Sequence, residues 1–216
     1  MDIAFVLFDR FTALDLIGPY NVLAYGPGVS THLVAASSAP VAADAGSLRI
    51  EPDCTFGELD SADVVVVPGG PGWRRIAEMN DLTEWLQRVD ATARYMSSVC
   101  TGAFALASAG LLDGRRATTH WTTTRHLAKY GVQHVPERVV VDGRYITGAG
   151  VSAGIDMALT LAGLMWGDEV AKTIQLANEY DPHPPYSAGS PATAPAVTVE
   201  VVRGLIDTEF GAPVRG

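Results

Sequence analysis

The chain has 216 residues, a formal net charge of −9 and a hydrophobic fraction of 48%. An acidic surface repels phosphate backbones, so we expect no nucleic-acid partner. No apolar run is long enough to cross a bilayer and no basic flank of a signal peptide precedes the first strand, so we expect a cytoplasmic protein without a membrane partner. The length predicts one domain, or one with a small appendage, and since no linker divides the chain we expect a single domain over residues 1–216.

Strands and helices are predicted to alternate along the first half of the chain. The apolar run at 3–8 predicts a strand buried on both faces. Thr12 is placed to cap the next helix, which Gly18 and Pro19 delay or bend. Further strands are predicted at 31–36, 48–50, 64–67 and 95–99. A helix carrying Trp85 is predicted before the last of these strands.

The second half of the chain continues the same pattern. The sequence predicts a hairpin at 139–147 around Asp142 and Gly143. Helices are then predicted at 153–166, 169–179 and 197–210, with an irregular proline-rich segment at 182–195. This alternation is typical of an α/β sandwich with a mainly parallel central sheet.

Cys100 has the sequence context of a nucleophile. It directly follows a predicted strand, with Ser98 two residues before it and Gly102 two residues after. This is the arrangement of a nucleophile elbow, a sharp strand-to-helix turn with room only for small neighbours. A helix N-terminus there favours the thiolate. The alternative is an inert buried cysteine. Cys54 has no such context, and we expect both thiols to be reduced.

Two other segments are expected beside Cys100, because sites in open α/β sheets form at the carboxyl ends of the strands. Asp15 follows the first strand among apolar neighbours. It is either a helix-cap or first-turn carboxylate favoured by the helix dipole, or a desolvated partner of Cys100 with a raised pKa that transfers protons. Gly69 and Gly70 follow the polyvaline strand. They form either a tight turn or a loop that presents N–H groups to substrate or developing charge.

Other polar residues carry weaker signals. His120 invites a Cys–His pair, but its place in the sequence does not put it beside Cys100, and its role stays open. Asp156 is interpreted as a first-turn carboxylate of its helix. The five histidines show no metal-ligand spacing, so we expect no metal site.

Several motifs together resemble the ThiJ/PfpI superfamily. They lie at 14–19, 68–70, 97–102, 110–121, 148–156, 179–180 and 184–185, and so cover nearly the whole chain. The resemblance implies a three-layer flavodoxin-like sandwich and a homodimer. It also implies Cys100 as nucleophile, Asp15 as its acid/base partner and Thr101 as a supporting hydrogen-bonding residue, with no cofactor.

The resemblance is narrower to the branch of this superfamily that hydrates isocyanides, because of residues 189–191 after Pro184-Pro185-Tyr186. It implies a small-molecule isocyanide substrate and an N-substituted formamide product. Many members have Glu where this chain has Asp15, and the protease-like branch has His where this chain has Thr101. A Cys–His mechanism is therefore not expected.

Two alternatives stay open. The same motifs occur in sensor domains of AraC-type regulators, so the chain is alternatively a ligand-sensing or redox-sensing module whose reactive cysteine is Cys100. Those regulators carry a further DNA-binding region, which we do not expect in this acidic chain. The other alternative is an enzyme that uses the same scaffold on a different electrophile.

Overall fold

A computed structural model describes residues 1–209 of the chain, and Phe210, the last residue of the predicted final helix, lies outside this part. Contacts divide the chain into one compact unit at Met1–Asn178 and a second that begins at Glu179. The prediction of a single domain over residues 1–216 stays a prediction.

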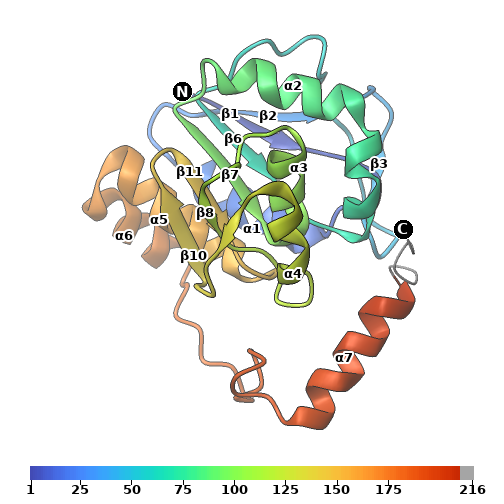
Figure 1. Ribbon diagram of the computed structural model, residues 1–216. Coiled ribbons are helices and arrows are strands. Elements are labelled where there is room, and N and C mark those ends of the chain that lie inside the picture. Colours follow the sequence, from blue (N-terminus) through green and yellow to red (C-terminus); the bar gives the residue numbers. More distant parts are fainter. Residues whose placement is uncertain (210–216) are drawn as a thin grey trace. The chain divides into compact units, whose positions relative to one another are not determined.

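The first unit is built on a central sheet of seven strands within the described residues (Figure 1), in the order β10-β11-β7-β6-β1-β2-β5. All neighbouring pairs are parallel except β10 and β11, which form the predicted hairpin. The strands are β1 (Asp2–Val6), β2 (Ser30–Ala35), β5 (Cys54–Thr55), β6 (Val64–Val67), β7 (Tyr95–Val99), β10 (Val139–Asp142) and β11 (Tyr145–Gly148). The predicted α/β class with a mainly parallel sheet is confirmed.

Two smaller sheets complete the strand content. They pair β3 (Val41–Ala42) with β4 (Arg49–Ile50) and β8 (Arg116–Ala117) with β9 (Gln133–His134). The first pair is an antiparallel hairpin over residues 41–50, and its strand β4 lies where the sequence predicts an extended segment.

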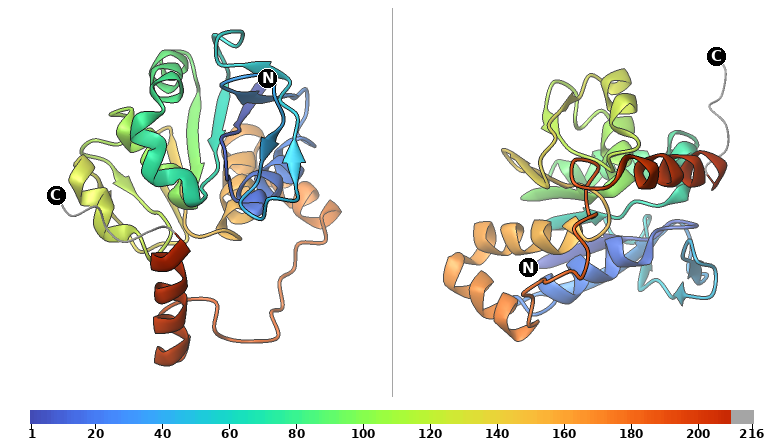
Figure 2. Two further views of the ribbon diagram at one scale, coloured as in Figure 1. Left: turned by 90° about the vertical axis from the view of Figure 1, so that its right-hand side faces the viewer. Right: turned by 90° about the horizontal axis from the view of Figure 1, so that it is seen from below.

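Helices cover both faces of the central sheet. On one face lie α1 (Ala13–Leu23), α5 (Ala153–Trp166) and α6 (Asp168–Ala177), and on the other α2 (Asn80–Asp90), α3 (Ala103–Ser108) and α4 (Thr124–Leu127), as the right-hand view of Figure 2 shows. Short 3-10 helices span Pro71–Glu78, Cys100–Gly102 and Ala128–Tyr130. The central strands are therefore buried from both sides, which explains their continuous apolar runs.

One helix start differs from the sequence prediction. Thr12 occupies the N-cap position of α1, but its side chain makes no capping hydrogen bond. Its hydroxyl instead donates to Asp44 Oδ2 at 2.7 Å. The helix is not delayed, since it begins at Ala13 and includes Pro19.

Between Glu179 and Glu209, the described part of the second unit holds one helix, α7 (Ala196–Glu209), after an irregular segment. Val197, Val201 and Leu205 are exposed at 71%, 56% and 63%, and their spacing of four places them on one helix face. Within residues 1–209, no helix is both long and apolar enough to span a membrane.

A polar cluster ties the hairpin of the central sheet to the end of α2. The Tyr145 hydroxyl donates to Asp90 Oδ1 at 2.9 Å, and Arg144 Nη2 donates to Asp90 Oδ2 at 2.6 Å. The Arg115 guanidinium lies over the Tyr145 ring, 4.2 Å from its centre.

We predict that Tyr145→Phe lowers the free energy of unfolding by about 1 kcal/mol, because a half-buried Asp90 oxygen loses its hydroxyl donor. Urea titration at neutral pH measures the change. Tyr25→Phe is the matched control, since Tyr25 is 69% exposed and should tolerate the same deletion. Equal unfolding midpoints for the two variants would contradict the prediction.

Candidate active site

The register of the sheet brings three loops to one edge. Val67 of β6 lies opposite Ser98 of β7, and Phe5 of β1 lies opposite Val66 of β6. The residues that follow these strands therefore emerge side by side at the carboxyl edge. Sequence analysis expected Asp15, the 68–72 loop and Cys100 to meet there, and the structure brings them into contact.

Cys100 sits at a sharp turn between β7 and a short 3-10 helix. Its φ is 57°, in the left-handed region that few residues other than glycine adopt. A Cβ at Gly102 would lie 2.3 Å from the carbonyl oxygen of Val67, so the turn needs glycine two residues after the cysteine. Ser98 is fully buried. The strand-to-helix turn and its small flanking residues follow the elbow pattern.

The Cys100 sulfur faces both hydrogen-bond donors and an acid. Backbone N–H groups of Thr101 and Val151 point at it, and the thiol hydrogen-bonds the Asp15 carboxyl. Burial, with the Asp15 charge second, raises the pKa of the thiol above its usual range. The backbone N–H groups lower the pKa of the thiol, as the elbow predicts, but burial and the neighbouring charge outweigh them.

Asp15 is completely buried in the first turn of α1. Its Oδ2 accepts a hydrogen bond from the Gly69 N–H at 2.9 Å rather than from its own helix. Its Oδ1 is buried and takes no N–H or O–H donor among the described residues. Desolvation raises the pKa of the carboxyl to about 7, with a smaller contribution from the Asp44 charge. A helix cap does not explain this carboxyl.

The N–H groups of Gly69 and Gly70 do not match the expectation that they face substrate or developing charge. Their N–H groups are already engaged, that of Gly69 by Asp15 and that of Gly70 by Thr101 Oγ1 at 2.9 Å. The Thr101 hydroxyl in turn donates to the Gly70 carbonyl at 3.1 Å. The two glycines are thus not free oxyanion donors, because both donors are satisfied within the protein. They hold Asp15 and Thr101 in place.

Gly69 is required by close approach. A Cβ there would lie 2.6 Å from the Thr101 nitrogen and 2.8 Å from Asp15 Oδ2. Real side chains do not approach that closely, so a larger residue would displace either the carboxyl or the elbow.

Sequence analysis missed three residues around the pair. Val151 has a φ of 33°, unusual for a β-branched residue, and its N–H faces the sulfur. Thr119 donates its hydroxyl to the Cys100 carbonyl at 2.8 Å, and Asp44 acts on Asp15 by charge. The motif at 148–156 marked the segment of Val151, but a backbone N–H leaves no signature in a residue type.

His120 lies against the neighbouring loop. Its Nδ1 is 2.7 Å from Thr122 Oγ1, and a Cβ at Gly150 would lie 2.5 Å from its ring. Burial lowers the pKa of the imidazole, which favours its neutral form. No contact between the imidazole and the Cys100 sulfur is recorded among the described residues, in line with the interpretation that no Cys–His pair forms.

The remaining predicted residues have structural places. Asp156 lies in the first turn of α5, as expected, and also pairs with Arg138 at 2.5 Å. Cys54 and Cys100 are both free thiols. Among the described residues, no group of three or more His, Cys, Asp or Glu side chains is arranged to hold a metal ion.

The geometry places a protonated Cys100 thiol in hydrogen-bond contact with the Asp15 carboxyl, whose pKa is about 7. With the carboxyl ionised, the thiol keeps its proton and donates it in a hydrogen bond. Transfer of that proton to Asp15 produces a thiolate and a carboxylic acid side by side in one step. This is the pair of groups that addition of sulfur and hydrogen across a multiple bond requires.

We predict that Asp15→Asn stabilises the fold at alkaline pH. A raised carboxyl pKa contributes stability that is complete below the unfolded value near 4 and is lost as pH rises through about 7. The amide cannot ionise, so the variant should gain a few kcal/mol over wild type between about pH 4 and pH 8.

Urea unfolding of both proteins across this pH range measures the difference. Asp60→Asn is the matched control, because the Asp60 side chain is 83% exposed. A stability difference between Asp15→Asn and wild type that does not change with pH would show that the carboxyl is not desolvated in the fold.

Comparisons with known proteins place this chain in a family. The family model described as DJ-1/PfpI family matches residues 1–163. An isonitrile hydratase from Pseudomonas putida is 45% identical over 94% of this chain and 89% of its own length. The regulator GbdR from Pseudomonas aeruginosa is 31% identical over 80% of this chain, which spans 48% of the regulator.

A comparison with solved structures agrees with this family assignment. A ThiJ/PfpI family protein from Pseudomonas syringae matches with a TM-score of 0.93 and 37% identity, covering 97% of this chain and 87% of its own. The match of the family model to most of the chain, the sheet topology and this structural likeness lead to one conclusion: the chain belongs to the DJ-1/PfpI family.

Proposed function

We propose that the protein hydrates isocyanides, converting an isocyanide and water into an N-substituted formamide through a covalent bond to Cys100. The observation that carries the proposal is the buried Cys100–Asp15 pair, which couples a nucleophile to a proton carrier. The similarity to an isonitrile hydratase over nearly the whole chain supports the choice of substrate class. The substrate is a small molecule, and the chemistry needs no cofactor.

The reaction begins with proton transfer from the Cys100 thiol to Asp15. The proton crosses the hydrogen bond that the thiol makes to the Asp15 carboxyl, while the Gly69 N–H holds that carboxyl through Oδ2. The thiolate attacks the terminal carbon of the isocyanide and forms a C–S bond. Asp15 returns the proton to the same carbon, giving a thioimidate.

Water completes the reaction. The Asp15 carboxylate, ionised again, removes a proton from water as it adds to the thioimidate carbon. Asp15 then passes the proton taken from water to the nitrogen, giving a neutral tetrahedral adduct. The adduct collapses as its hydroxyl becomes the carbonyl and the C–S bond breaks, and the hydroxyl proton passes through Asp15 to the departing sulfur. The products are an N-substituted formamide and the Cys100 thiol, so the atoms of one isocyanide and one water are accounted for.

The neighbouring groups have supporting roles in this mechanism. The N–H groups of Val151 and Thr101 face the sulfur and stabilise negative charge when the thiolate forms. The Thr101 hydroxyl and the two glycines fix the loop that holds the carboxyl. Thr101 thus positions the loop and does not itself touch the substrate.

We predict that Cys100→Ala abolishes formamide production and that Asp15→Asn lowers it by a factor of about 10² to 10⁴, since general acid–base catalysis contributes on that order. Cys54→Ala is the control and should keep full activity. The assay follows formamide formed from a simple alkyl isocyanide by chromatography.

The covalent step is tested separately. Rapid mixing, acid quench and intact-mass measurement should reveal an isocyanide adduct on wild type and on Cys54→Ala, and none on Cys100→Ala. Wild-type turnover in Cys100→Ala, or in a folded Asp15→Asn, would rule out this mechanism.

We also propose that the enzyme is a cytoplasmic homodimer and that residues 1–216 act as one functional unit. Two free thiols support a reducing compartment. The apolar stripe of Val197, Val201 and Leu205 on α7 supports self-association, because such a stripe on a soluble protein marks an interaction surface.

We predict the mass of a dimer in sedimentation equilibrium at micromolar concentration. The double variant Val201→Asp/Leu205→Asp should shift the equilibrium toward monomer, because it places charge in the stripe. Arg203→Asp alters charge on the opposite face of α7 and is the control. A wild-type monomer would refute the dimer, and equal dissociation of both variants would refute the role of the stripe.

A further inference from the structure

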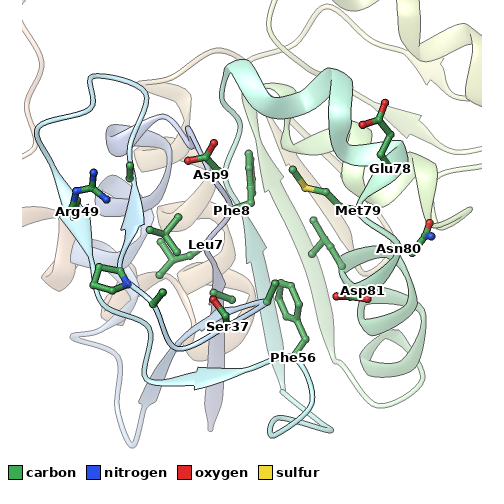
Figure 3. A pocket seen from close by; sticks show the side chains of 17 residues that line it. Leu7, Phe8, Asp9, Ser37, Arg49, Phe56, Glu78, Met79, Asn80 and Asp81 are labelled. Carbon is green, nitrogen blue, oxygen red and sulfur yellow. The ribbon is translucent and has the colours of Figure 1, made fainter.

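A cavity of about 500 Å³ opens on the first unit (Figure 3), and Cys100 does not line it. Its walls come from the loops after β1 and β2, from the β3–β4 hairpin and from the start of α2. This volume lies within the range of small-molecule sites, and the carboxyl ends of strands are where such sites occur in open α/β sheets.

The floor of the cavity is apolar. It is formed by the buried side chains of Leu7, Phe8, Ala35, Phe56 and Leu82. Met79 lies among them with its thioether, as Figure 3 shows. Two aromatic rings and a thioether favour an aromatic or branched aliphatic group, since sulfur and ring faces both pack well against rings.

The rim of the cavity is polar and carries more negative than positive charge. Three carboxylates, Asp9, Glu78 and Asp81, stand against one guanidinium, Arg49. Glu78 is paired with Arg75 at 3.8 Å, whereas Asp9 and Asp81 form no ion pair within the described part of the chain. The whole chain adds to this field with a net charge of −9. The rim thus favours a cation and disfavours an anion.

The cavity is separate from the catalytic pair. Neither Cys100 nor Asp15 lines it. The loop after β1 divides the two sites, since Leu7, Phe8 and Asp9 face the cavity while the next residues run along Gly70. A Cβ at Gly70 would lie 2.3 Å from the Arg10 carbonyl oxygen, and Thr12 N–H donates to the Gly69 carbonyl at 2.8 Å.

We propose that this cavity is a second small-molecule site, distinct from Cys100, that takes an amine with an aromatic or branched aliphatic body. The body lies on the apolar floor, and the ammonium group lies at the rim near Asp9 and Asp81. The inference stands on the cavity and its charges and does not depend on the proposed hydration reaction.

Binding is tested with 2-phenylethylamine as the probe and Cys100→Ala as the protein, measured by calorimetry at neutral pH. We expect saturable binding of one probe per chain, with a dissociation constant on the order of 1 mM, as suits so small a ligand. Phenylacetate, which has the same ring and the opposite charge, should bind at least about tenfold more weakly.

Variants locate the probe. Ala36→Trp fills the cavity from an exposed lining position and should weaken binding at least about tenfold, and Ala39→Trp does the same from a second lining position. Ala91→Trp, at an exposed alanine outside the cavity, is the matched control and should bind as before. Asp9→Asn/Asp81→Asn should lower the preference for the amine over phenylacetate.

The proposal is overturned if no saturable binding appears up to about 10 mM, since a ligand of this size should saturate the site by then. It is also overturned if phenylacetate binds equally well, or if both cavity-filling variants bind like wild type. Because these measurements use Cys100→Ala and no isocyanide, they succeed or fail independently of the hydratase assay.

Discussion

The interaction on which the site depends is the contact between a buried carboxyl and a buried thiol. Each group alone would be neutral in this environment, because desolvation raises the pKa of Asp15 and of Cys100 alike. The Asp15 carboxyl, with a pKa of about 7, is the group of the pair that ionises first, and its negative charge can move to the sulfur with one proton. A site that stores a thiolate permanently would need a cation, and none is in contact with this sulfur among the described residues.

The hydrogen bonds around Asp15 and Cys100 explain how the fold accommodates such a buried pair. Burial of a carboxylate costs free energy unless hydrogen bonds compensate for the lost water. The Gly69 N–H donates one such hydrogen bond to Asp15. The loop that offers it is fixed by a reciprocal hydrogen bond between Thr101 and Gly70, and Thr101 is the residue after the nucleophile. The position of the acid and that of the sulfur are therefore set by the same few atoms.

The sequence predicted the strands and the turn that build the site better than the electrostatics of the site. The runs at 3–8 and 64–67 fixed two neighbouring strands, and the small residues around Cys100 marked the elbow. Apolar neighbours of Asp15 signalled a desolvated acid. The state of the thiol was misjudged, because a helix N-terminus is visible in a sequence and the competing burial and charge of Asp15 are not.

The sequence also did not predict which backbone N–H groups face the sulfur. The donors that face the sulfur come from the Val151 and Thr101 peptides, and neither depends on the identity of a side chain. Gly69 and Gly70 were recognised as a special loop, but whether their N–H groups point to a substrate or to the protein depends on atoms from Asp15 and Thr101 that are distant in sequence. The Thr12 side chain does not cap α1 because its hydroxyl donates to Asp44, which is also distant in sequence.

The same electrostatics separate an enzyme from a redox sensor. A sensor cysteine reacts with oxidants as an exposed thiolate, and its pKa is low. Cys100 is 6% exposed, and its pKa is raised, so oxidants meet a protected thiol. An isocyanide is different, because it is small and uncharged, and it needs a proton as well as a nucleophile. Such a substrate uses both products of proton transfer from Cys100 to Asp15, which favours catalysis over sensing at this site.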